Sequence, residues 1–141
     1  MVIHEGHRAR MRQQIELFGL DSLSDVQFLE VALYQVIPRG DTNELAHRLL
    51  TQFGSLSGVL EASRTALLEV EGVGARTADF LQLFLQMERR HMICRAGQDL
   101  ILDSTDKCGR YLLPYFLGEH EEVVWLLCLD GKCKMLDCRL I

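Results

Sequence analysis

Residues 69–81 read EVEGVGARTADFL, a stretch with two glycines, two positions apart, directly before a helical pattern. Gly72 and Gly74 are able to adopt positive φ, and their missing side chains let another backbone approach closely. The loop amides would lie at the N-terminus of the next helix, where N–H groups lack partners and the dipole is positive. The stretch therefore predicts a phosphate-binding loop; the alternative is a packing corner between two helices. Its expected apolar frame is Leu68, Val70, Val73, Ala78 and Leu81.

Two side chains of this loop favour phosphate binding. Arg76 adds a charge-assisted contact, and Thr77 adds a hydroxyl donor. The acids Glu69, Glu71 and Asp79 crowd the same loop and oppose it. A contact of this kind reads no base sequence, because it touches only the phosphate backbone. The expected DNA-binding residues are Gly72, Val73, Gly74, Ala75, Arg76 and Thr77.

Two helices are predicted before residue 40. The sequence HRARMRQQIELFG (residues 7–19) has apolar residues at helical spacing and a terminal glycine. In the next segment, Ser24 and Gln27 form a capping box that starts a helix. The expected buried stripe of this second helix consists of Phe28, Leu29, Ala32, Leu33 and Val36.

Three more helical segments follow. The sequence NELAHRLLTQF (residues 43–53) has Asp41 or Thr42 as its cap and ends before Gly54. After a tight connection with a short helical turn, Ser63 starts a short helix that runs into the glycines. A long helix, apolar on one face, follows the glycines. The sequence therefore predicts a mainly α domain over residues 1–97, built around the glycine hairpin.

The pattern changes after residue 97. A short apolar strand-like start is followed by a helix from about Ser104, and then by two strand-like runs around Asp130–Gly131. A two-residue turn there would place Cys128 directly opposite Cys133, whereas a longer turn would put Cys133 in the loop. We place the domain boundary near residues 96–100. Residues 98–141 are then expected to form a short α/β segment.

This β segment is expected to be incomplete, because its apolar run stops abruptly at Ile141. The residues Val124, Leu126 and Leu140 would then be under-covered. Unpaired strand edges recruit other strands, so self-association through the C-terminal strands is expected.

Charge and composition limit the classes of function. The formal net charge is −5, and neither half of the chain is strongly basic. This argues against tight non-specific affinity for nucleic acid, so DNA contact is expected to be weak. No apolar run approaches the ~20 residues of a membrane span, and the N-terminus lacks a secretory signal. We therefore expect a cytoplasmic protein with no membrane partner.

Metal sites are not expected from the pattern of potential ligands. The five cysteines lie in the last third of the chain, and no pair has the CxxC spacing of a zinc site. Reduced thiols are expected. His4 and His7 have the spacing of a helical metal pair, but no third ligand is evident, so solvent exposure is expected for both. Trp125, in an apolar strand-like run, is expected in the core.

The glycine loop resembles a known motif. The pattern hGhGxxxAxxh of the helix-hairpin-helix motif, found in many DNA repair and recombination proteins, is matched from Glu71 to Ala78, with Phe80 and Leu81 following. The resemblance implies that the loop contacts DNA through phosphate.

A longer stretch resembles the N-terminal region of RadC, a bacterial family named for DNA repair. The resemblance covers about residues 6–141. At Thr77 this chain departs from the family, where a lysine is frequent; the loop thus lacks one cation, for which Arg76 compensates only in part. The segments that carry the resemblance are Leu23–Ser24–Asp25, Arg39–Gly40, Leu45–Ala46, Phe53–Gly54–Ser55–Leu56 and Glu71–Gly72–Val73–Gly74.

In the RadC family the C-terminal half is a JAB/MPN domain, an α/β fold of zinc metallopeptidases. Its signature is His-x-His-Pro-x-Gly followed by Ser and Asp, and zinc would activate water there with an upstream glutamate as general base. Glu122 lies where that glutamate would, but no histidine follows His120. Residues 98–141 are therefore expected to be an incomplete JAB/MPN-like segment without metal, cofactor or catalysis, and Glu122 an ordinary surface acid.

Two functions remain as expectations. The resemblance and the glycine hairpin favour a non-sequence-specific DNA-binding module. The acidic balance favours the alternative, a protein-interaction or self-association module with no DNA contact.

Overall fold

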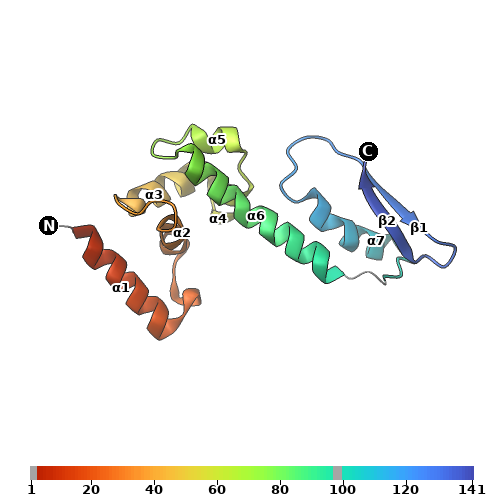
Figure 1. The fold of residues 1–141 in the computed structure, drawn as a ribbon, viewed down its shortest axis with the longest axis horizontal. Helices are drawn as coiled ribbons and strands as arrows, with labels where there is room; N and C mark the ends of the chain where they lie inside the picture. Colours follow the sequence, from red (N-terminus) through yellow and green to blue (C-terminus); the bar gives the residue numbers. More distant parts are fainter. Residues whose placement is uncertain (1–2, 97–99) are drawn as a thin grey trace. The chain divides into compact units, whose positions relative to one another are not determined.

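The chain folds into helices followed by a two-stranded antiparallel hairpin, over residues 3–96 and 100–141, which the computed structural model describes (Figure 1). The mainly helical fold that the sequence predicts is confirmed. The elements of the described residues are α1 (Ile3–Phe18), the 3-10 helix η1 (Leu20–Ser22), α2 (Asp25–Leu33), α3 (Thr42–Phe53), α4 (Leu56–Glu61), α5 (Arg64–Leu68), α6 (Ala75–Ala96), α7 (Thr105–Leu112), the 3-10 helix η2 (Leu113–Phe116), β1 (Trp125–Leu129) and β2 (Met135–Leu140).

Contacts between residues divide the chain into two compact units, Met1–Gln82 and Leu83–Ile141. The boundary expected near residues 96–100 overlaps residues 97–99, which lie outside the described residues. The division into domains 1–97 and 98–141 stays a prediction, and the two compact units are described separately below.

Side-chain caps define where the helices begin. The Ser24 hydroxyl accepts from the Gln27 N–H, and the Gln27 side chain accepts from the Ser24 N–H, which confirms the capping box. Asp41, the first of the two candidates, caps α3. Gly54 ends α3 at a φ of 82°. The caps of α4, α5 and α7 are Ser55, Ser63 and Ser104.

The buried stripe of α2 differs in part from the prediction. Leu29 and Leu33 are buried, but Phe28 is 41% exposed. The residue that joins the buried stripe is Glu30, one position after Leu29, so the core-facing side of α2 is rotated away from Phe28. The helix ends at Leu33, and Val36 packs against the core from the following turn.

The core of the first unit is built by α2, α3, α4, α5 and the first turns of α6. Its buried side chains are almost all aliphatic, and they come from every one of these helices, so each helix is fixed by burial of one face. The core residues are Leu29, Leu33, Leu45, Ala46, Leu49, Val59, Ala62, Leu67, Val70, Val73, Ala78 and Leu81.

A buried carboxylate connects α1, α2 and α3. Glu30 is only 2% exposed, and its oxygens accept from the Tyr34 hydroxyl (3.0 Å) and the Asn43 amide (3.1 Å). His7 of α1 lies 3.1 Å from the same carboxylate. The expectation that His7 is simply solvated is therefore wrong, because a buried carboxylate holds its ring. Burial, and then the bond to Glu30, raises the pKa of Tyr34 above its ordinary value.

Arg8 makes a second connection from α1. Its guanidinium lies 4.3 Å from the centre of the Tyr34 ring and donates to the carbonyls of Ile37 (2.9 Å) and Pro38 (3.0 Å). A planar guanidinium can stack on an aromatic ring and donate hydrogen bonds at the same time. Arg8 thus fixes α1 to the segment that follows α2.

In the second unit, β1 and β2 pair antiparallel around a turn longer than two residues. The Asp130 side chain accepts from the N–H groups of Lys132 (2.8 Å) and Lys134 (2.9 Å), and Cys133 has a φ of 60°. Cys133 therefore lies in the loop, and Cys128 faces Asp137 across the strands, with an irregular register between Cys128 and Leu129. The longer of the two turns considered from the sequence is confirmed. None of the five cysteines is paired in a disulfide.

The aromatic residues of the second unit cluster beside β1. The rings of Tyr115 and Trp125 meet edge to face at 4.8 Å, and the Arg89 guanidinium lies 5.8 Å from the centre of the Trp125 ring. Trp125 is only partly buried, so its placement in a core is confirmed in part. Burial, followed by the hydrogen bond with the Tyr111 hydroxyl, raises the pKa of Tyr115.

Apolar side chains of the hairpin remain open to solvent. Val124, Leu126 and Leu140 are 58%, 45% and 54% exposed. The expected under-coverage of these three residues is confirmed.

Candidate nucleic-acid interface

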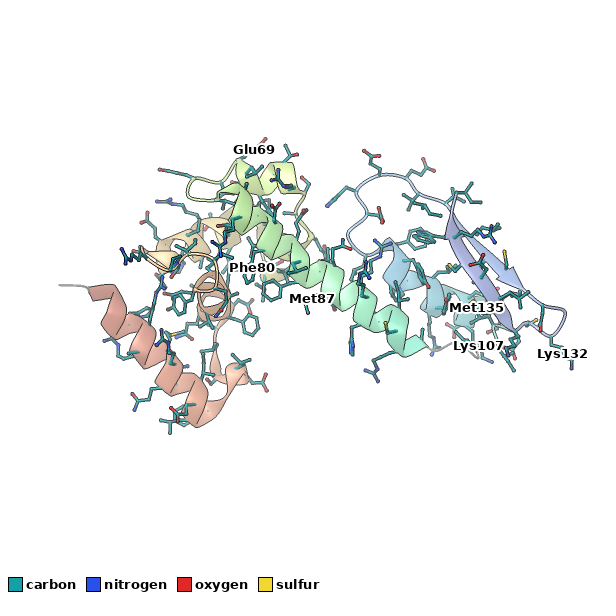
Figure 2. The ribbon with its side chains drawn as sticks, viewed as in Figure 1. Glu69, Phe80, Met87, Lys107, Lys132 and Met135 are labelled. Atoms are coloured by element: carbon teal, nitrogen blue, oxygen red, sulfur yellow. The ribbon has the colours of Figure 1, made fainter. Side chains whose placement is uncertain are left out.

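The glycine stretch forms a tight turn between α5 and α6. The Val70 N–H donates to the Leu67 carbonyl (3.1 Å), and the Val73 N–H donates to the Val70 carbonyl (3.0 Å). The helical bonds of α6 begin where the Ala78 N–H donates to the Gly74 carbonyl (3.0 Å). Figure 2 labels Glu69, the last residue before this turn, whose side chain is exposed. The turn and the start of α6 (residues 70–77) are called the hairpin loop below.

Apolar residues on both sides anchor the hairpin loop. Leu67, Val70, Val73, Ala78 and Leu81 are all buried in the core of the first unit. The expected apolar frame is correct with one exception: Leu68 is 38% exposed, and Leu67 occupies its place in the core. The short helix α5 turns Leu67 inward and leaves Leu68 beside it at the surface. The side chain of Val73 serves packing, so this residue offers a ligand only its backbone.

The two glycines have different roles. Gly72 has a φ of 95°, and a Cβ at this position would lie 3.3 Å from Leu45 Cδ1. Gly74 is not at positive φ, contrary to the conformation considered from the sequence, and a Cβ there would point into open space. Gly72 is therefore required by the turn and by packing. Gly74 leaves room for an approaching group.

The start of α6 presents its backbone amides beside Gly74. The N–H groups of Ala75, Arg76 and Thr77 precede the first ladder bond of the helix, so they have no acceptor within it. Ala75 and Arg76 are exposed, whereas Thr77 is 5% exposed. The Thr77 hydroxyl is thus not available to a phosphate, because one turn before Leu81 it faces the core. This residue keeps only its backbone N–H as a candidate.

Charges around the hairpin loop are largely paired. The Arg64 guanidinium donates to Asp79 at 2.6 Å. Arg48, from α3, forms an ion pair with Glu44 and donates to the Glu71 carbonyl at 3.2 Å. Such pairing reduces the positive charge that these arginines offer to an anion.

Arg76 differs from these arginines. Its side chain is exposed, and within the part of the chain that the structure describes it forms no hydrogen bond or ion pair. A guanidinium in this state is free to bind a phosphate oxygen at the N-terminus of α6. The structure therefore brings together the Gly74 opening, the amides of α6 and one uncommitted cation.

Sequence reasoning did not find Arg48. This residue lies 23 positions before Glu71, and only the packing of α3 against the hairpin brings the two together. The side of the loop that Arg48 borders is a shallow depression of about 440 Å³. Because this side carries three acids, an anion is disfavoured there. Its lining consists of Glu44, His47, Arg48, Thr51, Gln52, Glu69, Val70 and Glu71.

The other candidate features of the chain are a metal site, Glu122 and a membrane-spanning helix. Among residues 3–96 and 100–141, no group of three or more His, Cys, Asp or Glu side chains is placed to hold a metal ion. Glu122 is exposed, three residues before β1, which is the surface position expected for it. In the same described ranges, no helix has the length and apolar character needed to cross a membrane.

The chain is similar to a curated bacterial protein. It is 33% identical over 127 residues to a UPF0758 protein of Pseudomonas fluorescens (strain SBW25). The matched region covers 90% of this chain and 57% of the relative, so the chain spans little more than half the length of that relative. The chain is therefore a homologue of a UPF0758 protein over most of its own length. No family model matches the sequence, and no solved structure matches it.

Proposed function

We propose that this chain, as a homologue of a UPF0758 protein, is a non-sequence-specific DNA-binding module of a RadC-like protein. In this proposal a backbone phosphate binds the backbone amides of Ala75, Arg76 and Thr77, at the start of α6. The Arg76 guanidinium adds a charge-assisted hydrogen bond. Gly72 and Val73 shape the loop, and Thr77 contributes its backbone alone.

The observation that carries this proposal is the open space at Gly74. A Cβ there would meet no atom beyond its chain neighbours within 4 Å, although the residues around it are anchored in the core. A glycine that neither conformation nor packing requires, beside unpaired helix amides, is suited to close approach of a phosphate.

Binding of this kind is expected to be weak and to decrease as the salt concentration rises. Glu69, Glu71 and Asp79 lie in or beside the loop, and Glu44 borders it. Counterion release drives association with DNA, and a single free guanidinium releases few ions. The useful measurements are therefore made at low ionic strength.

Gly74→Val is expected to weaken binding to a fluorescein-labelled plain duplex by roughly five- to tenfold, because the branched side chain occupies the approach to the amides and removes about one charge-assisted bond. Fluorescence anisotropy titrations at low salt measure the change. The matched control is Gly131→Val in the β1–β2 turn, where a Cβ also points into open space and φ is not positive. Circular dichroism establishes that both variants are folded. Equal affinity of a folded Gly74→Val protein and wild type would reject the loop as the DNA contact.

Arg76→Ala is expected to weaken binding by a similar factor for every duplex sequence tested. The slope of log K against log salt concentration should fall by about one, because one phosphate contact is lost. Arg64→Ala is the comparison, since Arg64 is already paired with Asp79 and is expected to change the slope less. A sequence-dependent loss, or an unchanged slope, would contradict a single phosphate contact at Arg76.

We also infer that residues 98–141 correspond to the opening part of a JAB/MPN-like domain. Support comes from the homology and from the helix-then-hairpin order of α7, β1 and β2. The sequence contains no His-x-His-Pro stretch, so these residues by themselves are not expected to hydrolyse a peptide. The alternative function, self-association, is favoured by the edge of β2 that has no strand partner among the described residues.

A further inference from the structure

The outer edge of β2 has no strand partner at Cys138 and Leu140 among the described residues. The Ile141 N–H donates to the Val124 carbonyl at 2.9 Å, toward β1. The Cys138 N–H instead donates to its neighbour, the Asp137 carboxylate, at 2.9 Å. Backbone groups of successive residues point to opposite sides of an antiparallel strand. The groups of Cys138 and Leu140 therefore face away from β1.

Among the described residues, another segment covers the beginning of this edge. The Met135 N–H donates to the Leu100 carbonyl (2.9 Å), and the Leu102 N–H donates to the Cys133 carbonyl (2.7 Å). In the described ranges, residues 137–140 have β1 as their sole strand partner, and Leu136 lies at the irregularity of the register without a partner in β1. A strand edge of this kind is a template for another strand.

Residues 136–140 read LDCRL, which complements itself in the antiparallel direction. With Cys138 at the centre, Asp137 comes opposite Arg139 of a second copy, and Leu136 opposite its Leu140. A centre at Asp137 or at Arg139 would place like charges against each other instead. Opposite charges across two strands attract and like charges repel, so the charges select one register.

We propose that β2 pairs antiparallel with β2 of a second copy of this chain, about a two-fold axis at Cys138. The two hairpins then form a four-stranded sheet in the order β1, β2, β2, β1. The contact is isologous: each Asp137–Arg139 pair occurs twice, once on either side of the axis. In the single chain Arg139 and Asp137 already pair with each other at 2.5 Å, so both side chains lie on the same face, ready to be shared with a second copy.

Apolar exposure adds to this match. Leu136 is 64% exposed and Leu140 is 54% exposed, and the proposed register sets each against the other residue of the second copy. Burial of these two side chains would contribute favourable hydrophobic free energy to the association. A contact of five residues a side is small, so the dimer is expected to be weak.

The test uses charge reversal on the full chain. Asp137→Arg places two arginines across the proposed interface at each charged position, and Arg139→Asp places two aspartates there. Each variant alone is expected to raise the dimer Kd at least about tenfold. Sedimentation equilibrium up to about 300 μM measures this, a range suited to a small interface. An equimolar mixture of the two variants is expected to restore dimers, because every pair is again opposite in charge.

Two controls separate register from net charge. Lys132→Asp and Glu121→Arg change the charge by the same amounts at exposed residues outside β2, and both are expected to associate as wild type does. The double variant Asp137→Arg with Arg139→Asp exchanges the two charges and is expected to associate as well. Circular dichroism confirms that each variant is folded.

The proposal is overturned by a wild-type chain that is monomeric over this range. It is equally overturned by folded single variants that dimerise as wild type does, or by a mixture that stays monomeric. Only residues of the second unit take part, so the result is independent of DNA contact at the hairpin loop.

Discussion

Replacing Gly72 by valine is expected to lower the free energy of unfolding by about 2–4 kcal/mol. Gly72 has a φ of 95°, a conformation in which a β-branched residue is a steric outlier. Its new Cβ would lie 3.3 Å from Leu45 Cδ1 and 3.7 Å from the Arg48 guanidinium, so the core side chain must also move. Urea unfolding followed by circular dichroism measures the loss.

Gly74→Val is the matched comparison, since the two glycines share a loop but only one is at positive φ. It is expected to change stability by no more than about 1 kcal/mol, the scale of a helix-cap substitution. The two variants therefore separate folding from recognition: Gly72 is expected to govern folding, and Gly74 is proposed to govern access to the amides. Equal destabilisation by the two substitutions would contradict the conformations described for them.

Glu30→Ala is expected to cost about 3 kcal/mol, because it removes the common acceptor of a buried cluster. The Tyr34 hydroxyl and the Asn43 amide would lose their partner, and His7 would lose its carboxylate. Urea unfolding again gives the value. Glu30→Gln retains one acceptor oxygen and is expected to lose less.

The control for Glu30 is Glu16→Ala, which removes an exposed carboxylate from α1 and is expected to stay within about 0.5 kcal/mol of wild type. His7→Ala isolates the contribution of α1 and is expected to cost less than Glu30→Ala, since the His7 ring is partly solvated. A Glu30→Ala protein as stable as the control would show that the cluster does not hold the three helices together.

The helix starts were predictable because their determinants are local. Ser24 and Gln27 satisfy each other over three residues, and Asp41 and Ser63 each accept the N–H three residues ahead. The residues that set these boundaries all lie within one helical turn. The first residues of the helices can therefore be predicted from the sequence alone.

The features that sequence missed depend on packing between distant segments. Glu30 is buried because His7 and Asn43, from other helices, surround it, and nothing in the spacing of the apolar residues separates it from a surface glutamate. Arg48 reaches the hairpin loop only after α3 packs. The exposure of Phe28 follows from the rotation of α2 that admits Glu30.

The candidate site was predictable in outline and not in detail. The turn and the helix after it were evident from the glycines and the apolar frame. The sequence did not show that Gly72 alone is at positive φ, or that Thr77 turns its hydroxyl into the core. Both depend on the angle at which α6 meets the other helices of the first unit, and a pattern of residue types does not encode that angle.

The caps of the first unit also bear on the time course of folding. Each of α2 to α5 has its first turn fixed by a side chain only three residues away, so closing that turn costs little chain entropy. When the chain collapses, the starts of these helices are then already defined, and folding requires only that their apolar faces pack together. Proteins dominated by such short-range contacts refold rapidly. We therefore expect this unit to refold with a time constant of about milliseconds or less. The side chains that set this pace are Ser24, Asp41, Ser55 and Ser63.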